Sequence, residues 1–116
     1  MRIALMAFVA GAVLACVIAP SVAQNTAVPV MIDNFVFESA RLTIKAGTTV
    51  TWTNRDDTPH TVAAKDRAFK SKAMDTDESY SFTFSTPGEY NYFCSLHPHM
   101  VGTIVVEGTA GSGATQ

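Results

Sequence analysis

Apolar and polar side chains alternate along most of the chain from residue 28 onward. A period of two residues is typical of strands that bury one face and expose the other. Turn-forming residues separate the stretches, at 33–34, 45–47, 54–59, 75–78 and 86–88. At a spacing of roughly eight to twelve residues, the pattern predicts an all-β sandwich of seven or eight strands. The alternating apolar positions are Val28, Val30, Ile32; Leu42, Ile44; Val50, Trp52; Tyr80, Phe82, Phe84; and Ile104, Val106.

The alternation fades between Ala63 and Asp77, where we expect a loop with at most a short strand. Four basic residues lie in the segment 65–72 of this loop. Clusters of this size usually form a solvated face, and we read this one in that way. The alternative is a docking site for an acidic partner.

The two ends of the chain differ in composition from the middle. A basic Arg2, an apolar run over residues 3–18 and the small-residue sequence Pro20-Ser21-Val22-Ala23 predict a signal peptide at 1–23, cleaved after Ala23. Two alternatives are a retained membrane anchor and lipidation of Cys16. Residues 24–107 then form one domain in the periplasm, and the Gly-rich tail 108–116 is expected to be disordered.

The predicted mature chain is small and mildly acidic. Seven Lys and Arg and ten Asp and Glu remain after residue 23, which gives a net charge of −3. This balance argues against a nucleic-acid partner. A domain of this length buries only about 60 to 65 per cent of its unfolded surface, so a bound metal would add needed stability.

Cysteine usage points to a metal. Once the signal is removed, Cys94 is the only cysteine left, so an internal disulfide is not possible. A single thiol in an oxidising compartment is expected to be buried, paired with another chain or held by a metal.

The residues around Cys94 favour the metal. The sequence Cys94-Ser95-Leu96-His97-Pro98-His99-Met100 holds two of the three histidines and has the spacing C-x-x-H-x-x-M. Two imidazoles, a thiolate and a weak axial thioether are the donors of a blue-copper site. His60 is the one histidine far from this loop, and we expect it to supply the fourth ligand, from the start of a strand at the rim of the sandwich.

Other interpretations of the same residues are weaker. A Cys and two His also suit a catalytic zinc site, but the thioether of Met100 is a poor zinc ligand and no acid or base is evident nearby. His99 is not needed by the site and is expected to be exposed. Taken singly, Cys94 and Met100 would be ordinary core residues.

These motifs resemble those of the cupredoxin family over about residues 28–107. The short loop is most similar to that of amicyanin-type members, since plastocyanin- and pseudoazurin-type members have a longer spacing between the second His and the Met. Further matching segments are Trp52-Thr53-Asn54, Thr58-Pro59-His60, Pro87-Gly88-Glu89-Tyr90 and Gly102-Thr103-Ile104-Val105-Val106.

The resemblance implies a Greek-key β-sandwich with one type 1 copper held by His60, Cys94, His97 and Met100. It also implies that Asn54 hydrogen-bonds near the copper loop and ties the two ligand segments together; the alternative is that Asn54 only opens a turn.

The implied function is one-electron transfer between redox proteins such as a dehydrogenase, a cytochrome or an oxidase, by a monomer that is not an enzyme and is not stably bound to a membrane. Thr58, Leu96 and His99 flank the ligands where amicyanin-type proteins present an apolar surface, so the partner does not carry over. The alternative function is copper binding and delivery.

Overall fold

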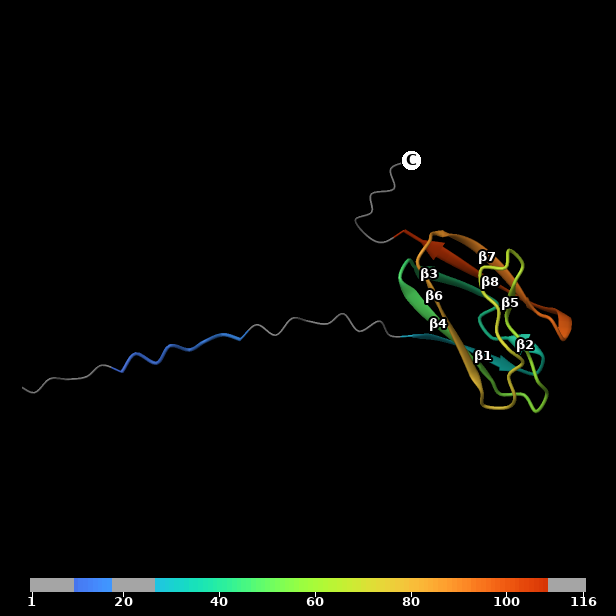
Figure 1. The fold of residues 1–116 in the computed structure, drawn as a ribbon, viewed down its shortest axis with the longest axis horizontal. Helices are drawn as coiled ribbons and strands as arrows, with labels where there is room; N and C mark the ends of the chain where they lie inside the picture. The colour runs from blue at the N-terminus through green and yellow to red at the C-terminus, as the bar shows by residue number, and fades with distance from the viewer. Residues whose placement is uncertain (1–9, 18–26, 109–116) are drawn as a thin grey trace, which may run out of the picture.

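The computed structural model describes residues 10–17 and 27–108, and within them every regular element is a strand. The eight strands make two sheets of four that face each other (Figure 1). The predicted all-β sandwich is therefore confirmed. The strands are β1 (Val28–Asp33), β2 (Val36–Phe37), β3 (Arg41–Lys45), β4 (Thr48–Asn54), β5 (Ala63–Ala64), β6 (Ser79–Phe84), β7 (Gly88–Cys94) and β8 (His97–Glu107).

Both sheets are mixed. The first has the order β2-β1-β4-β6 and the second β3-β8-β7-β5. The pairs β1–β4 and β3–β8 are parallel, whereas the other pairs are antiparallel. Parallel neighbours cannot be joined by a tight hairpin, so the chain crosses between the two sheets to make them.

Aromatic rings fill the space between the sheets. Trp52 on β4 stacks on Phe69 with 5.8 Å between ring centroids and meets the edge of Tyr92 on β7 at 5.4 Å. Trp52 and Tyr92 are completely buried. The Tyr92 ring lies directly against Gly102 of β8, where a Cβ atom would collide with it. This packing therefore requires a glycine at 102 in β8, which with β7 carries the Cys-His-Met loop.

Three details of the strands differ from the sequence prediction. The last alternating positions in the sequence were Ile104 and Val106, but β8 begins earlier, at His97. A strand was expected from His60, which instead makes a single bridge to Met74, and β5 follows at Ala63–Ala64 as the short strand of the predicted loop. The short β2 carried too little alternation to be predicted.

The predicted signal peptide at 1–23 lies mostly outside the described residues, as does the tail beyond Gly108. Of the signal, the structure describes only residues 10–17, which form neither helix nor strand. No helix in the described ranges is long and apolar enough to cross a membrane.

The Tyr92 hydroxyl gives a prediction about stability. Burial raises the pKa of Tyr92 from 10.0 to about 12, against a smaller lowering by the neighbouring Trp52. Among the described residues, neither the Tyr92 hydroxyl nor Trp52 Nε1 makes a hydrogen bond of good geometry. Above pH 10 an unfolded tyrosine ionises while the folded one keeps its proton, so stability falls by about 1.4 kcal/mol per pH unit up to pH 12. We expect Tyr92→Phe to remove this loss and to leave stability at pH 7 unchanged or up to about 1 kcal/mol higher.

Urea unfolding of the metal-free protein at pH 7 and pH 11 measures both effects. Tyr90→Phe is the matched control, because the Tyr90 hydroxyl donates to the Thr86 carbonyl at 2.7 Å. The control should lose about 1 kcal/mol at pH 7. A Tyr92→Phe variant less stable than the Tyr90→Phe variant at pH 7 would contradict the prediction.

Candidate metal centre

A two-residue turn brings Cys94 and His97 together. Cys94 at the end of β7 pairs directly with His97 at the start of β8, so only Ser95 and Leu96 form the turn. Paired residues in an antiparallel ladder project to the same face with Cβ atoms about 4.5 to 5.5 Å apart. The C-x-x-H spacing is therefore the spacing that puts a thiol and an imidazole side by side at the end of a hairpin.

The register of this hairpin is irregular beside the turn. Phe93 pairs with Val101 and the next residue, Cys94, pairs with His97, so residues 98–100 are an insertion in β8. From Met100 onward every second residue of β8 faces inward, and Met100 is 5% exposed. The insertion thus turns Met100 inward, into the same core cluster that contains Cys94.

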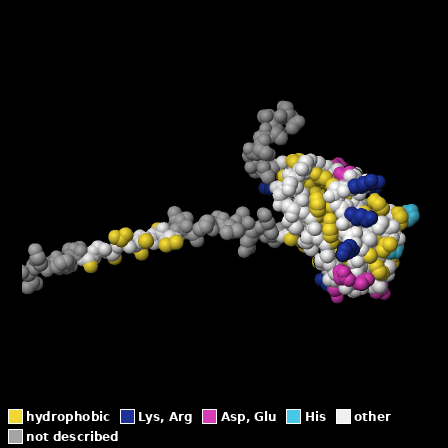
Figure 2. All heavy atoms as spheres, viewed as in Figure 1, with side chains coloured by type: hydrophobic (Ala, Val, Ile, Leu, Met, Phe, Trp, Pro, Cys, Tyr) yellow, Lys and Arg dark blue, Asp and Glu magenta, His cyan; other side chains and the backbone are white. Residues whose placement is uncertain are grey.

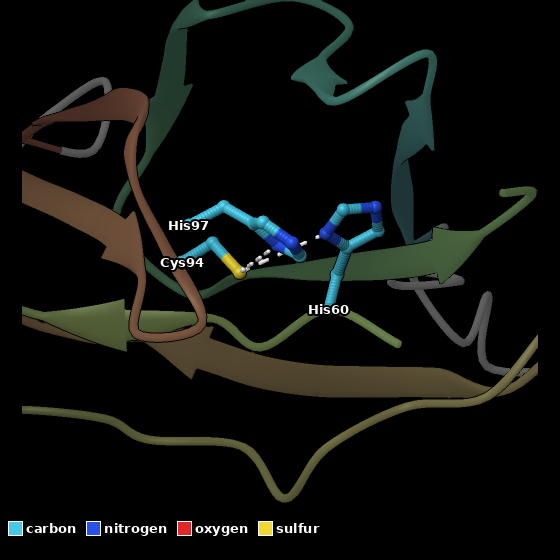
Figure 3. Close-up of side chains that lie close together, drawn as sticks. All are labelled: His60, Cys94 and His97. Atoms are coloured by element: carbon cyan, nitrogen blue, oxygen red, sulfur yellow. Dashed lines mark hydrogen bonds between the residues drawn. The ribbon is translucent and has the colours of Figure 1, made fainter. Parts of the chain in front are cut away.

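His60 reaches the same point from the loop that follows β4. Its ring is completely buried, and the backbone of His60 is hydrogen-bonded in both directions to Met74. The side chains of His60, Cys94 and His97 converge, with their three donor atoms all within 4.8 Å of one another (Figure 3). His60 was expected at the rim of the sandwich, and its side chain is buried in the protein.

The separations among these atoms fit a metal ion. Cys94 Sγ lies 3.7 Å from His60 Nδ1 and 3.7 Å from His97 Nδ1. A first-row metal about 2.3 Å from sulfur and about 2.0 Å from nitrogen, with a trigonal angle between them, would separate the two donors by about 3.7 Å. The side chains are therefore already spaced for a three-coordinate metal with Met100 beside it.

A buried carboxylate, absent from the sequence prediction, orients His60. Asp56 Oδ2 accepts a hydrogen bond from His60 Nε2 at 2.7 Å. Because an ionised carboxylate can only accept, the proton of this imidazole is on Nε2, and the lone pair of Nδ1 faces Cys94. A carboxylate behind a histidine ligand fixes its tautomer and raises its basicity.

Asp56 is itself held by the turn between β1 and β2. The backbone N–H groups of Asn34 and Phe35 donate to its two oxygens at 2.6 and 2.9 Å. Burial opposes ionisation of Asp56, but these two bonds together with His60 outweigh it and lower the pKa of the carboxyl below its ordinary 3.8. The ionised carboxylate therefore stabilises the fold above about pH 4, and the contribution is lost as the pH falls through the lowered pKa.

Phe35 covers the centre from the outside. Its ring meets His60 and His97 edge-on, with centroids 5.1 and 5.0 Å apart and interplanar angles of 89°. Asn34 and Phe35 both have left-handed backbone conformations, with φ of 52° and 59°. A two-residue hairpin turn requires such values, but for Phe they cost roughly 1 to 2 kcal/mol. The bonds to Asp56 offset that strain.

Thr61 joins the two ligand segments. Its backbone N–H donates to Cys94 Sγ at 3.3 Å, and its Oγ1 accepts from the Ser95 N–H at 2.7 Å. Asn54 was expected to make this tie. It instead donates to the carbonyls of Thr58 and Met74, both at 2.9 Å, and accepts from the Asp56 N–H in the manner of a turn-opening residue. Asn54 thus braces the loop that presents His60.

The remaining candidates fall outside the cluster of donor atoms. His99 is exposed, as expected, and is not among the converging side chains. Cys16 is an exposed free thiol in the described part of the predicted signal peptide. Sequence reasoning missed Asp56, Phe35 and Thr61. The one sequence signal for any of the three was the acidic Asp56, four residues before the candidate ligand His60.

These observations define a class of protein: a two-sheet β-sandwich with a soft nitrogen and sulfur metal centre at one end. A family model for the Cupredoxin-like domain matches residues 4–106. The chain belongs to the cupredoxin family.

Amicyanins are among its relatives. The chain is 42% identical to amicyanin of Paracoccus versutus over 86 residues, which cover 70% of this chain and 65% of that protein, just under two thirds of its length. It is 37% identical to amicyanin-alpha of Methylorubrum extorquens over 111 residues, 90% of this chain and 93% of the relative. A solved Cu(I) form of an amicyanin mutant superposes with a TM-score of 0.67 at 39% identity, covering 75% of this chain and 87% of that structure.

Family and geometry together identify the cofactor as copper. The donor set of two imidazoles, one thiolate and one thioether, at separations that fit a trigonal ion, is the type 1 arrangement.

The Asp56–His60 pair gives the next prediction. Replacing Asp56 by Asn removes the charge behind His60 and leaves one amide oxygen to accept from three donors. We expect copper affinity to fall by about 10- to 100-fold, measured by competition with a Cu(I) chelator.

Asp57, the exposed residue next to Asp56, provides the control for the affinity measurement. Asp57→Asn makes the same chemical change one residue away and should leave affinity within about twofold of the unmodified protein, since exposed substitutions away from a site have small effects. Equal affinities in the two variants would show that Asp56 does not position His60.

Proposed function

We propose that this protein is an exported type 1 copper protein that carries single electrons between redox partners. The observation that supports the proposal most directly is the placement of His60 Nδ1 and His97 Nδ1 at equal distances from Cys94 Sγ. Copper bound there would supply a one-electron couple between Cu(II) and Cu(I). The proposed ligands are His60, Cys94, His97 and Met100, with Asp56 and Thr61 behind them.

The surrounding residues favour rapid electron transfer because they resist movement. His60 is held at Nε2, Cys94 Sγ accepts from the Thr61 N–H, and the Phe35 ring restrains both imidazoles. A site that is already arranged before the metal enters needs little rearrangement when the metal changes charge. Hydrogen bonding to the thiolate and the axial Met100 would set the reduction potential.

His97 is the proposed point of electron entry and exit. It is partly exposed, whereas His60 and Cys94 are completely buried. A partner that contacts the end of the sandwich would therefore approach closest to the copper through the His97 ring.

Export through a signal peptide at 1–23 and a periplasmic location belong to the same proposal. They rest on the basic Arg2, the apolar run and the small residues up to Ala23. A membrane-inserted or lipidated form is distinguished by the mass of the mature protein, which should begin at Gln24.

The spectrum of the copper-loaded protein tests the site. We expect an intense thiolate-to-copper absorption in the red with Cu(II), and its complete loss in Cys94→Ser. Cys16→Ser in the full-length chain is the matched control and should keep the colour. A colourless Cu(II) complex of the unmodified protein would falsify the type 1 assignment.

Copper delivery is the second candidate function. The exposed His99 next to Met100 favours it, because a labile histidine beside the site offers copper a route outward. A carrier of electrons should hold copper for hours against a chelator and show reversible voltammetry. A delivery protein should release copper in minutes and show no reversible wave.

A further inference from the structure

The charges of the domain are divided between one hairpin and the rest of the surface. Residues 65–72 hold four cations and one acid, a local charge of +3. The remaining part of the described domain holds three cations and nine acids, a charge of −6. The positive charge is therefore concentrated in one segment of a protein whose net charge is negative. The four cations are Lys65, Arg67, Lys70 and Lys72, called here the basic hairpin.

These cations form no ion pairs with the residues that the structure describes. Among the described residues, the basic side chains in ion pairs are Arg41, bound to Glu89, and Arg55, bound to Asp77, apart from the His60–Asp56 contact. All four side chains of the basic hairpin are exposed. Their charge is therefore available to something outside the molecule.

The basic hairpin is firmly attached to the core. Phe69 in its middle is buried and stacks on Trp52, and Ser71 exchanges hydrogen bonds with the backbone of Val62. The Ala64 N–H donates to the Phe69 carbonyl, which closes the turn. Buried Phe69 and Ser71 alternate with exposed Lys70 and Lys72, so both lysines project outward from a fixed backbone.

A proposed copper ligand lies close to the basic hairpin. His60 bridges to Met74, two residues beyond Lys72, and Ala63 bridges to Lys70. In Figure 2 the Lys and Arg side chains of this face form a row next to the edge of the molecule where histidine is visible.

We propose that the basic hairpin is the docking surface for the acidic face of a redox partner protein and orients that partner toward His97. The inference rests on the proposed electron-carrier function. An acidic partner is repelled by the −6 of the remaining surface and attracted by the +3 of one face, so it arrives with one orientation. Fields of this kind raise association rates and fix register more than they raise affinity.

Electron exchange with two c-type cytochromes, one strongly acidic and one strongly basic, tests the proposal in the copper-loaded protein. We expect the acidic cytochrome to react faster at low ionic strength and its rate to fall as salt is added. The net charge of −3 alone predicts the opposite dependence, with the acidic cytochrome accelerated by salt. Salt dependence therefore separates a local face from overall charge.

Two charge reversals provide a matched pair. Lys72→Glu should slow the acidic cytochrome by roughly threefold or more at low salt. Lys45→Glu makes the same change in net charge at the opposite end of the sandwich, because Lys45 of β3 is opposite Glu107, the last residue of β8, in the strand ladder. This control substitution should change the rate less than twofold. Equal effects of the two substitutions would overturn the proposal.

The outcomes also distinguish failure of the docking surface from failure of the proposed electron-carrier function. Exchange with neither cytochrome, in a protein that is blue, contradicts the electron-carrier function itself. Exchange with the basic cytochrome, or with both and independent of Lys72, leaves the carrier function standing and overturns the docking surface. Sedimentation with phosphatidylserine vesicles that is lost in Lys72→Glu would assign the face to a membrane surface, which also overturns it.

Discussion

The buried carboxylate of Asp56 is the interaction on which the geometry of the metal centre depends. It follows β4 of the first sheet and accepts hydrogen bonds from the turn between β1 and β2 and from His60. Through these bonds one side chain sets the tautomer of a ligand and keeps Phe35 against both imidazoles. Three donors on one carboxylate also explain why its pKa is lowered despite burial.

The two sheets contribute different halves of the centre. Cys94, His97 and Met100 belong to the β7–β8 hairpin of the second sheet, whereas Asp56 and Phe35 belong to loops of the first. His60 lies between them, bonded to Asp56 on one side and placed beside Cys94 on the other. A metal at this point joins the layers, so its binding energy is also folding energy, a useful contribution in a domain this small.

Sequence patterns predicted the parts that depend on local spacing. Period-two alternation gave the sandwich, and C-x-x-H-x-x-M gave the ligand loop because a two-residue hairpin makes Cys94 and His97 neighbours. Asp56 and Phe35 escaped prediction because their roles arise only when β1, β2 and the loop after β4 are brought together. Asn54 was placed in the right loop but given the wrong bonds, since nothing in a single sequence distinguishes Thr61 from Asn54 as the residue that reaches Cys94.

The basic segment 65–72 shows what the fold adds to composition in describing a surface. In the sequence it is a charge cluster in a region of broken alternation, for which a solvated face is the ordinary interpretation. In the fold, Phe69 anchors it in the aromatic core and the bridge from His60 to Met74 attaches it to the metal centre. A charged loop that moves freely averages its field over many positions, whereas the backbone of this one is fixed to the aromatic core and to the segment that carries His60. Rigidity and proximity together convert an ordinary cluster into a surface that can orient a partner.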